Sequence, residues 1–332
     1  MNSSLYKNIR KSITSLDYSS KDFFQVAKLI YDYQKEHNQI FRSYINYLNC
    51  LDKEIKSIED FIFLPIEHFK RHKVVSGNWQ EEKIFKSSGT SLSVRSQHYV
   101  RDLNWYLDGC VYAFESAFDN LNGSIVIGLL PNYLEQGNSS LVAMVDHFIK
   151  KTNHSNSGFY LDEIDALPNL LVELKSLDIP VYVIGVSYAL LDLATKYTGD
   201  FSHVKFIETG GMKGKRKEMT KDEVHDVLNH GFKTSHIYSE YGMTELFSQA
   251  YMLTDKVFFP ASTLQILVNE VNDPFKYIQN KTGQLNVIDL MNIDTCSFIQ
   301  TSDLAKRYSN GSFEVLGRID YSDIRGCNLM ID

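Results

Sequence analysis

Two short polar loops carry the residues of this chain best suited to chemistry. The first runs Lys-Ser-Ser-Gly-Thr-Ser over residues 86–91, and the second runs Tyr-Ser-Glu-Tyr-Gly-Met-Thr-Glu over residues 238–245. The small side chains, hydroxyls and free backbone N–H groups of the first loop suit phosphate oxygens. In the second loop, Thr244 adds a hydroxyl for a phosphate oxygen, and Glu245 adds a carboxylate of the kind that Mg²⁺ prefers.

Two further motifs follow, Thr301-Ser302-Asp303 and Gly317-Arg318-Ile319-Asp320. Each of the four segments is weak alone, because a Ser/Gly-rich stretch is usually an ordinary polar turn and Thr-Ser-Asp usually ends a strand or forms an Asx-turn. Together, in this order, they predict a site for ATP.

Composition indicates a globular protein and argues against nucleic acid and membranes as partners. It has 332 residues, 43% of them hydrophobic, which is enough for a sizeable core. The net charge is −7, and no Lys/Arg cluster reaches the density that nucleic-acid binding needs. The N-terminus lacks an apolar signal region, and no apolar run is long enough to span a bilayer. We therefore expect a cytoplasmic protein that binds no nucleic acid and does not insert into membranes.

The coarse pattern predicts an α/β fold in which the chain forms one domain with three parts. Residues 1–80 form a helical N-terminal segment, since apolar residues recur at helical spacing from Lys21 to Tyr33. Residues 81–258 alternate buried-strand runs such as Ile125–Leu130 and Val181–Val186 with helical segments, which is typical of a parallel sheet covered on both faces. Thr220 begins a capping box ahead of another helix. Residues 259–332 form a smaller β-rich portion.

The order of the motifs resembles the adenylate-forming enzymes, the superfamily of acyl- and aryl-CoA ligases. The similarity covers about residues 80–326 and includes a Gly-Gly turn after a strand, Glu208-Thr209-Gly210-Gly211-Met212. Within the superfamily the sequence is most similar to the acyl-protein synthetases (LuxE-type) of bacterial fatty-acid reductase complexes. Four stretches carry this finer resemblance: residues 63–70, 130–140, 208–219 and 322–329.

The resemblance implies roles for particular residues. The phosphate loop would hold the β- and γ-phosphates through Ser87, Ser88, Gly89, Thr90 and Ser91. The adenine would lie against Gly210, Gly211 and Met212, where a missing Cβ allows close approach, and beside Tyr241 and Gly242. Thr244 would bind the α-phosphate, Glu245 would hold Mg²⁺, Asp303 would accept hydrogen bonds from the ribose, and Arg318 would contact the ribose or a phosphate. The acyl chain would enter near residues 130–133.

The resemblance also implies a reaction. ATP would activate a carboxylic acid, in this branch a fatty acid, as an acyl-adenylate, and a protein thiol would then accept the acyl group. Cys327, which follows Arg325 and Gly326, is the candidate acceptor, because a nearby cation favours the thiolate. The onward partner would be an acyl reductase or a carrier protein.

Two departures from the superfamily pattern keep other functions open. Leu92-Ser93-Val94-Arg95 stand where many relatives have a second Gly and a Lys, so that Lys86 or Arg95 would supply the missing charge. We also expect the chain to lack the mobile C-terminal domain with its catalytic Lys, since it ends just after Gly-Arg-Ile-Asp. The alternatives are an acyl- or aryl-CoA ligase, which shares the first step, and a non-catalytic subunit that binds an acyl nucleotide.

Overall fold

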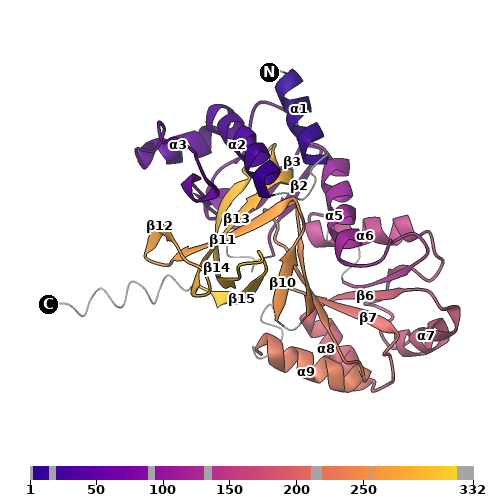
Figure 1. Cartoon of the computed structure of the whole chain (residues 1–332). Helices are drawn as coiled ribbons and strands as arrows, with labels where there is room; N and C mark the ends of the chain where they lie inside the picture. The colour runs from indigo at the N-terminus through magenta and orange to yellow at the C-terminus, as the bar shows by residue number, and fades with distance from the viewer. Residues whose placement is uncertain are drawn as a thin grey trace. The chain divides into compact units, whose positions relative to one another are not determined.

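The structure is a computed structural model that describes residues 3–14, 20–88, 94–130, 137–210, 219–254 and 256–319. The chain divides into two compact units. Unit 1 combines residues 1–78 with residues 262–332, and unit 2 is the continuous segment 79–261. Figure 1 labels many of the helices and strands of both units.

Unit 2 is built on a mixed sheet with the strand order β10-β9-β8-β7-β6-β4-β5. The strands β4 to β8 pair in parallel, whereas β9 and β10 are antiparallel to their neighbours. All residues of β4 and β6 are buried, as expected for strands covered on both faces. The strands are β4 (Ile125–Leu129), β5 (Gly158–Phe159), β6 (Val181–Val186), β7 (Val204–Thr209), β8 (Tyr238–Tyr241), β9 (Ala250–Thr254) and β10 (Val257–Pro260).

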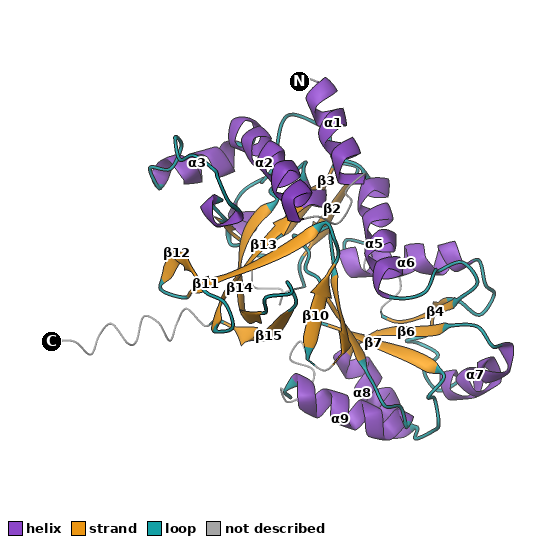
Figure 2. Cartoon of the chain, viewed as in Figure 1, coloured by secondary structure: helices purple, strands orange, loops and turns teal. Residues whose placement is uncertain are grey.

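Helices cover both faces of this sheet (Figure 2). On one face, Phe114 of α5 packs edge-on against Tyr182 of β6 and Tyr251 of β9. On the other, Phe232 of α9 stacks on Phe206 of β7 with ring centroids 4.0 Å apart. The helices of unit 2 are α5 (Leu103–Ala117), α6 (Ser140–Thr152), α7 (Leu167–Leu174), the 3-10 turn η2 (Lys175–Leu177), α8 (Ser187–Lys196) and α9 (Lys221–Phe232). A separate hairpin pairs β2 (Lys83–Lys86) with β3 (Gln97–Val100).

Unit 1 contains an antiparallel sheet with the strand order β12-β11-β13-β14-β15, to which β1 adds in parallel beside β14. Its strands are β1 (Leu64–Pro65), β11 (Leu264–Glu270), β12 (Asp273–Tyr277), β13 (Thr282–Asp289), β14 (Phe298–Arg307) and β15 (Phe313–Arg318). Its helices are α1 (Ser3–Thr14), α2 (Ser20–His37), α3 (Gln39–Tyr47) and α4 (His68–Arg71), with 3-10 turns η1 (Ile58–Asp60) and η3 (Leu290–Asn292).

Buried amides fasten the N-terminal helices of unit 1 to the segment between β13 and β14. The Gln34 amide donates to the Asn292 carbonyl over 2.9 Å and accepts a hydrogen bond from the backbone N–H of Ser297. The Asn38 amide donates to the Thr295 carbonyl over 2.8 Å. Both side chains are fully buried, and unmet hydrogen bonds there would cost free energy, so these contacts specify how helices from one end of the chain pack on strands from the other.

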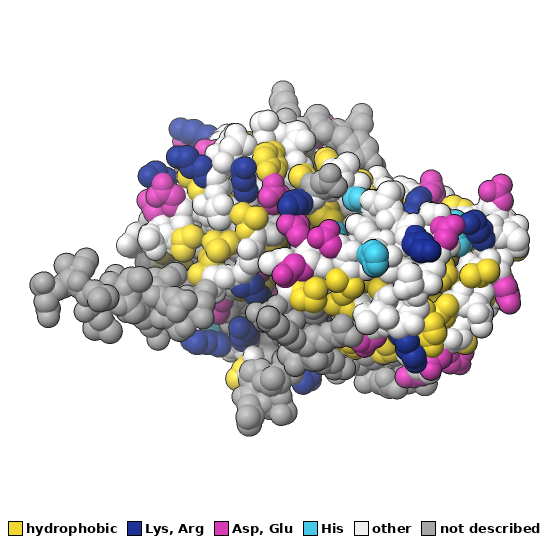
Figure 3. Space-filling model, turned by 90° about the horizontal axis from the view of Figure 1, so that it is seen from below, with side chains coloured by type: hydrophobic (Ala, Val, Ile, Leu, Met, Phe, Trp, Pro, Cys, Tyr) yellow, Lys and Arg dark blue, Asp and Glu magenta, His cyan; other side chains and the backbone are white. Residues whose placement is uncertain are grey.

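The elements confirm the α/β prediction, including the helix behind the Thr220 capping box and the strand beginning at Val204. The short strands β5, β8, β9 and β10 were not predicted, because runs of two to five residues carry too little periodicity. No helix within the described ranges is both long enough and apolar enough to cross a membrane. On the face shown in Figure 3, acidic and basic side chains are interspersed among hydrophobic ones.

Candidate functional site

The carboxyl ends of β7 and β8 bring two of the predicted segments side by side in unit 2. Gly210 follows β7 directly, and the Gly242 to Glu245 stretch follows β8. The register pairs Thr209 with Glu240, so the end of β7 lies next to the end of β8. Ligands of open α/β sheets bind at this edge, beyond the carboxyl ends of the strands.

His98 connects this edge with the hairpin that precedes it. Its Nδ1 lies 2.7 Å from the backbone oxygen of Thr244, and its ring packs 4.6 Å from that of Phe247. The side chain is completely buried, and desolvation lowers its pKa to about 4 although the Thr244 carbonyl opposes the shift. A carbonyl only accepts hydrogen bonds, so the neutral imidazole carries its proton on Nδ1. The sequence analysis did not single out His98, because its hydrogen-bond partner is 146 positions away in the sequence.

The described part of the predicted phosphate loop, Ser87 and Ser88, continues from this hairpin. The backbone N–H of Ser87 donates to the Ser96 carbonyl, and the Ser87 hydroxyl accepts a hydrogen bond from the backbone N–H of Ser96 over 3.0 Å. Ser87 is half-buried and Ser88 is exposed. The remaining predicted phosphate-loop residues, Gly89, Thr90 and Ser91, lie outside the described residues. The hairpin thus positions the start of the loop near Thr244, through His98 on its second strand.

Thr244 and Glu245 occupy the loop after β8 in different settings. Thr244 is half-buried, whereas Glu245 is only 4% exposed. Just before them, Tyr241 is buried with its ring edge-on to Phe258, and Gly242 is exposed. A Cβ on Gly242 would meet the end of the Glu240 side chain, which would have to move to admit it. Within the described ranges, no three His, Cys, Asp or Glu side chains cluster in a way that would hold a metal ion.

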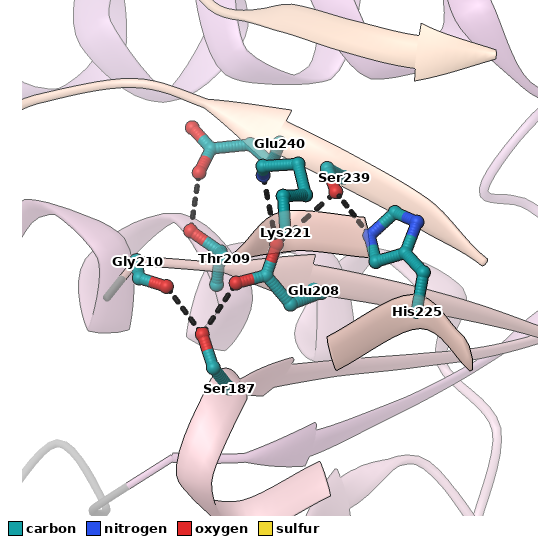
Figure 4. Close-up of polar contacts among 8 residues, drawn as sticks. All are labelled: Ser187, Glu208, Thr209, Gly210, Lys221, His225, Ser239 and Glu240. Carbon is teal, nitrogen blue, oxygen red and sulfur yellow. Dashed lines mark hydrogen bonds and ion pairs between the residues drawn. The ribbon is translucent and has the colours of Figure 1, made fainter. Parts of the chain in front are cut away.

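A polar cluster lies at the carboxyl end of β7, next to Gly210 (Figure 4). Glu208 is its centre: the carboxylate accepts hydrogen bonds from the hydroxyls of Ser187 and Ser239 and pairs with Lys221, whose Nζ is 3.1 Å away. The Ser187 hydroxyl also contacts the Gly210 carbonyl oxygen at 2.5 Å, and His225 reaches Ser239 over 3.1 Å. Sequence reasoning named Glu208 only as part of a motif and missed its partners.

Glu240 lies on the opposite face of the sheet from Glu208. Its carboxylate accepts a hydrogen bond from the Thr209 hydroxyl. Burial raises the pKa of Glu240 to about 7, more than the Thr209 hydrogen bond lowers it, and nearby Glu208 adds to the increase. The two residues before Gly210 are therefore held from both sides of the sheet, and Gly210 itself has a φ of +75°, which favours glycine.

Asp303 and Arg318, the other predicted nucleotide contacts, lie in unit 1. They face each other on β14 and β15, and the Arg318 Nε lies 3.2 Å from an Asp303 carboxylate oxygen. The Asp303 side chain is 11% exposed and that of Arg318 is 75% exposed. The structure thus joins these two residues, which are 15 positions apart in the sequence.

The remaining predicted residues lie outside the described ranges. These are Gly211, Met212 and Cys327, as well as residues 131–133 of the expected acyl entrance, although β4 does end next to Leu130 at Leu129. Three other cysteines are described. Cys110 and Cys296 are buried, and burial raises the pKa of the Cys296 thiol to about 12, while Cys50 is half-buried.

The α/β fold of this chain is similar to the fold of ligases in solved structures. The structure of ATP-bound MatB from Rhodopseudomonas palustris aligns with a TM-score of 0.52 at 17% identity and covers 71% of this chain. An open conformation of 2-hydroxyisobutyryl-CoA ligase in complex with 2-HIB-AMP and CoA aligns with a TM-score of 0.68 at 14% identity and covers 91%.

These comparisons concern the fold. The chain spans 47% of the length of MatB and 70% of that of the 2-hydroxyisobutyryl-CoA ligase. The sequence matches no protein-family model and no curated protein.

Proposed function

We propose that this protein activates a carboxylic acid with ATP, forming an acyl-adenylate. The observation that carries the proposal is the convergence of the Gly210 turn, the Thr244–Glu245 loop and the Ser87 hairpin in unit 2, the last two joined through His98. MatB was solved with ATP bound and the 2-hydroxyisobutyryl-CoA ligase with 2-HIB-AMP bound, and the fold of this chain is similar to both.

In this reaction the substrate carboxylate attacks the α-phosphate and pyrophosphate leaves. The residues of unit 2 serve mainly to orient the two anions and to offset their charge. Thr244 contacts the α-phosphate, and the Ser87 loop holds the outer phosphates. Tyr241 and the Gly210 turn flank the adenine. Asp303 and Arg318 pair with each other within unit 1, and their contact with the ribose stays a prediction of the resemblance.

A single buried carboxylate at Glu245 fits Mg²⁺, which binds nucleotide sites through one or two carboxylates together with substrate phosphates. The ion would offset negative charge on the phosphates. The chain's part is to present Glu245 next to Thr244, at the end of β8.

The finer proposal is that the acyl group passes to a protein cysteine as a thioester for an acyl reductase, and that the acid is a fatty acid. It rests on the resemblance to acyl-protein synthetases. Cys327 is the proposed acceptor. Among the described cysteines, Cys296 is a poor nucleophile because its raised pKa keeps it a thiol, and Cys110 is buried.

Incubation of the purified chain with a radiolabelled fatty acid and ATP tests these proposals. Label on the protein, released by neutral hydroxylamine, supports the acyl-protein synthetase. Label on added CoA supports a CoA ligase, the alternative that the 2-hydroxyisobutyryl-CoA ligase structure favours. Absence of both label and acid-dependent ATP–pyrophosphate exchange would leave only nucleotide binding.

Cys327→Ser separates the two half-reactions. It should keep acid-dependent ATP–pyrophosphate exchange, because adenylation involves only the acid and the nucleotide. It should lose the labelled thioester, since an alkoxide is far scarcer than a thiolate near neutral pH. Cys50→Ser, which alters the half-buried thiol, is the matched control. Retention of thioester in Cys327→Ser would move the acceptor to another cysteine.

A further inference from the structure

A second polar cluster lies on the face of the unit 2 sheet that α5 covers, opposite the Glu208 cluster. Glu240 of β8 and Tyr251 of β9 are cross-strand neighbours, so their side chains share this face. Thr209 of β7 joins them, since its hydroxyl donates to the Glu240 carboxylate (Figure 4). The Tyr251 ring packs edge-on against Phe114 of α5, with the ring centroids 5.9 Å apart. The cluster therefore lies between α5 and the ends of β7 and β8.

Two side chains of this face bury polar atoms that no described residue satisfies. Gln249, which directly precedes β9, donates from Nε2 to the Phe247 carbonyl over 3.1 Å and to the Cys110 sulfur over 3.4 Å. Its Oε1 and the Tyr251 hydroxyl have no hydrogen-bond partner among the described residues. Gln249 is 3% exposed and Tyr251 is 2% exposed. Because an unmet hydrogen bond in a buried group costs free energy, the two atoms indicate a missing partner outside the chain.

The two unpaired groups face adjacent turns of α5. Gln249 contacts Cys110, and Tyr251 packs on Phe114, which is four residues further along the helix. Burial raises the pKa of the Tyr251 hydroxyl well above its usual value, and Glu240 and Cys110 raise it further, because negative charge on either residue disfavours ionisation of the phenol. The Tyr251 hydroxyl therefore lies within electrostatic range of Cys110, the residue that Gln249 contacts.

The cluster extends to the surface beside Gly242. A Cβ placed on Gly242 would lie 3.3 Å from the carboxylate carbon of Glu240 and 3.6 Å from Cγ of Gln249. Gly242 is exposed and Glu240 is half-buried, whereas Gln249 is buried. The neighbouring surface is aromatic, since the Phe247 ring packs 5.0 Å from that of Tyr106. A ligand that enters beside Gly242 would thus meet apolar rings and a few polar atoms, as in many small-molecule sites.

The unpaired atoms select the chemical group that fits them. The Gln249 Oε1 can only accept a hydrogen bond, whereas the Tyr251 hydroxyl can donate one. A carboxylate cannot donate to Gln249 and would be repelled by an ionised Glu240. An ammonium group cannot accept from Tyr251. A hydroxyl group donates one hydrogen bond and accepts others, so it can satisfy both atoms.

We propose that Gln249 and Tyr251 determine the acyl specificity of this protein by binding a hydroxyl group on the chain of the substrate acid. The inference rests on the proposed adenylation and narrows the proposed fatty acid to a hydroxylated one. Because the cluster ends at Gly242, two residues before Thr244, the hydroxyl lies close to the carboxyl group, on carbon 2 or carbon 3. An unsubstituted chain leaves both buried atoms unpaired, which is how a site built for a hydroxyl rejects the analogue that lacks it.

Acid-dependent ATP–pyrophosphate exchange with octanoate, 2-hydroxyoctanoate and 3-hydroxyoctanoate tests the proposal. The wild-type chain should use one of the hydroxylated acids with a kcat/KM at least about tenfold above that of octanoate. A kcat/KM for octanoate equal to or above both others would overturn the inference and leave adenylation standing. Absence of exchange with every acid would refute adenylation, and calorimetric binding of the same three acids would then decide the inference. Failure to bind a hydroxylated acid more tightly than octanoate would overturn it.

Tyr251→Phe is the sharpest variant, because it removes only the unpaired hydroxyl. Its urea midpoint should be at least as high as that of wild type, while most of the preference for the hydroxylated acid is lost and the KM for ATP stays within about twofold. The matched control is Tyr182→Phe. The Tyr182 hydroxyl lies on the same face but donates to Asp119 over 3.0 Å, so its loss should lower the urea midpoint and keep the preference.

Gln249→Met removes the acceptor at similar side-chain length and should also lose the preference. If it misfolds because the Phe247 carbonyl loses its donor, Tyr251→Phe decides alone. An unchanged preference in Tyr251→Phe is the result expected if ordered water pairs with both atoms, and it would overturn the proposal. An equal loss of preference in Tyr182→Phe would also overturn it, since the effect would then belong to the packing of this face.

Discussion

At the scale of single residues, the candidate site joins groups whose environment sets their chemistry. His98 is neutral because burial lowers its pKa, and its Nδ1–H donates to the Thr244 carbonyl. Burial also raises the pKa of Glu240, to about 7. Glu245 is buried in the loop that follows β8. The role of each side chain can therefore be tested by a substitution that changes its charge and keeps its shape.

Glu245→Gln tests the proposed Mg²⁺ contact. The substitution removes a negative charge and almost no volume, so we expect acid-dependent ATP–pyrophosphate exchange to fall at least about 100-fold while the fold is retained. Glu173→Gln, on an exposed position of α7, is the matched control and should exchange normally. Exchange near the wild-type rate in Glu245→Gln would remove this residue from the site.

Glu240→Gln tests the raised pKa of Glu240. The folded state favours the protonated carboxyl, with a pKa of about 7 against an ordinary value of 4.5. The folded chain therefore binds more protons than the unfolded chain between these values, and this group's contribution to stability is lost as the pH rises from 4.5 to above 7. Glutamine cannot ionise. Urea unfolding should show that the variant gains stability relative to wild type between pH 5 and pH 8; a constant difference would contradict the shift.

At the scale of elements, helix starts position two members of the polar cluster around Glu208. Lys221 enters the Glu208 cluster because α9 begins at that residue, and Ser187 enters it because α8 begins there. The start of α9 is defined by a capping box: the Thr220 hydroxyl accepts from the Glu223 N–H, and the Glu223 carboxylate accepts from the Thr220 N–H over 2.7 Å. This local device positions Lys221 opposite Glu208.

Thr220→Ala should therefore destabilise the start of α9, from which Lys221 reaches Glu208. Loss of the cap should lower the free energy of unfolding by about 1 kcal/mol, as measured by urea denaturation. Thr220→Ser keeps the hydroxyl and should unfold within a few tenths of a kcal/mol of wild type. A fall as large in Thr220→Ser as in Thr220→Ala would indicate that packing of the Thr220 methyl group, and not the cap, stabilises the helix.

At the scale of the whole molecule, two neutral histidines, the buried His98 and the half-buried His225, make the fold sensitive to acid. Burial lowers the pKa of both His98 and His225 to about 4, below the ordinary value of 6.5. Between these values the unfolded chain binds more protons than the folded chain, so the stability contributed by these residues is complete above pH 6.5 and is lost as the pH falls toward 4.

This acid sensitivity is clearest in the Glu240→Gln background, because Glu240 has the opposite pH dependence over part of the same range. We expect the urea midpoint of that variant to fall between pH 7 and pH 5. Adding His225→Gln should flatten the fall, since glutamine does not titrate. A midpoint that does not change with pH in the single variant would show that the two histidines do not titrate below their ordinary range.

Much of the architecture follows from local sequence alone. The buried apolar runs at Ile125 and Val181 and the Thr220 capping box indicated strands and helices that the structure contains, because burial on both faces and helix capping leave patterns in short segments. The order of the polar motifs likewise indicated which loops are candidates for an ATP site. Short strands such as β9 and β10 were missed, since pairing with neighbours stabilises them more than their own composition does.

The tertiary structure decided which residues of the candidate site contact one another. His98 and Thr244 are 146 positions apart, and Glu208 meets Ser187 and Ser239 only because parallel strands align their carboxyl ends at one edge. Hydrogen bonds and desolvation act over a few ångströms in space, and sequence separation does not measure that distance. The sequence by itself therefore determined many of the helices and strands and the types of functional group present. The packing of the sheet determined which side chains form hydrogen bonds with each other and which charges are buried.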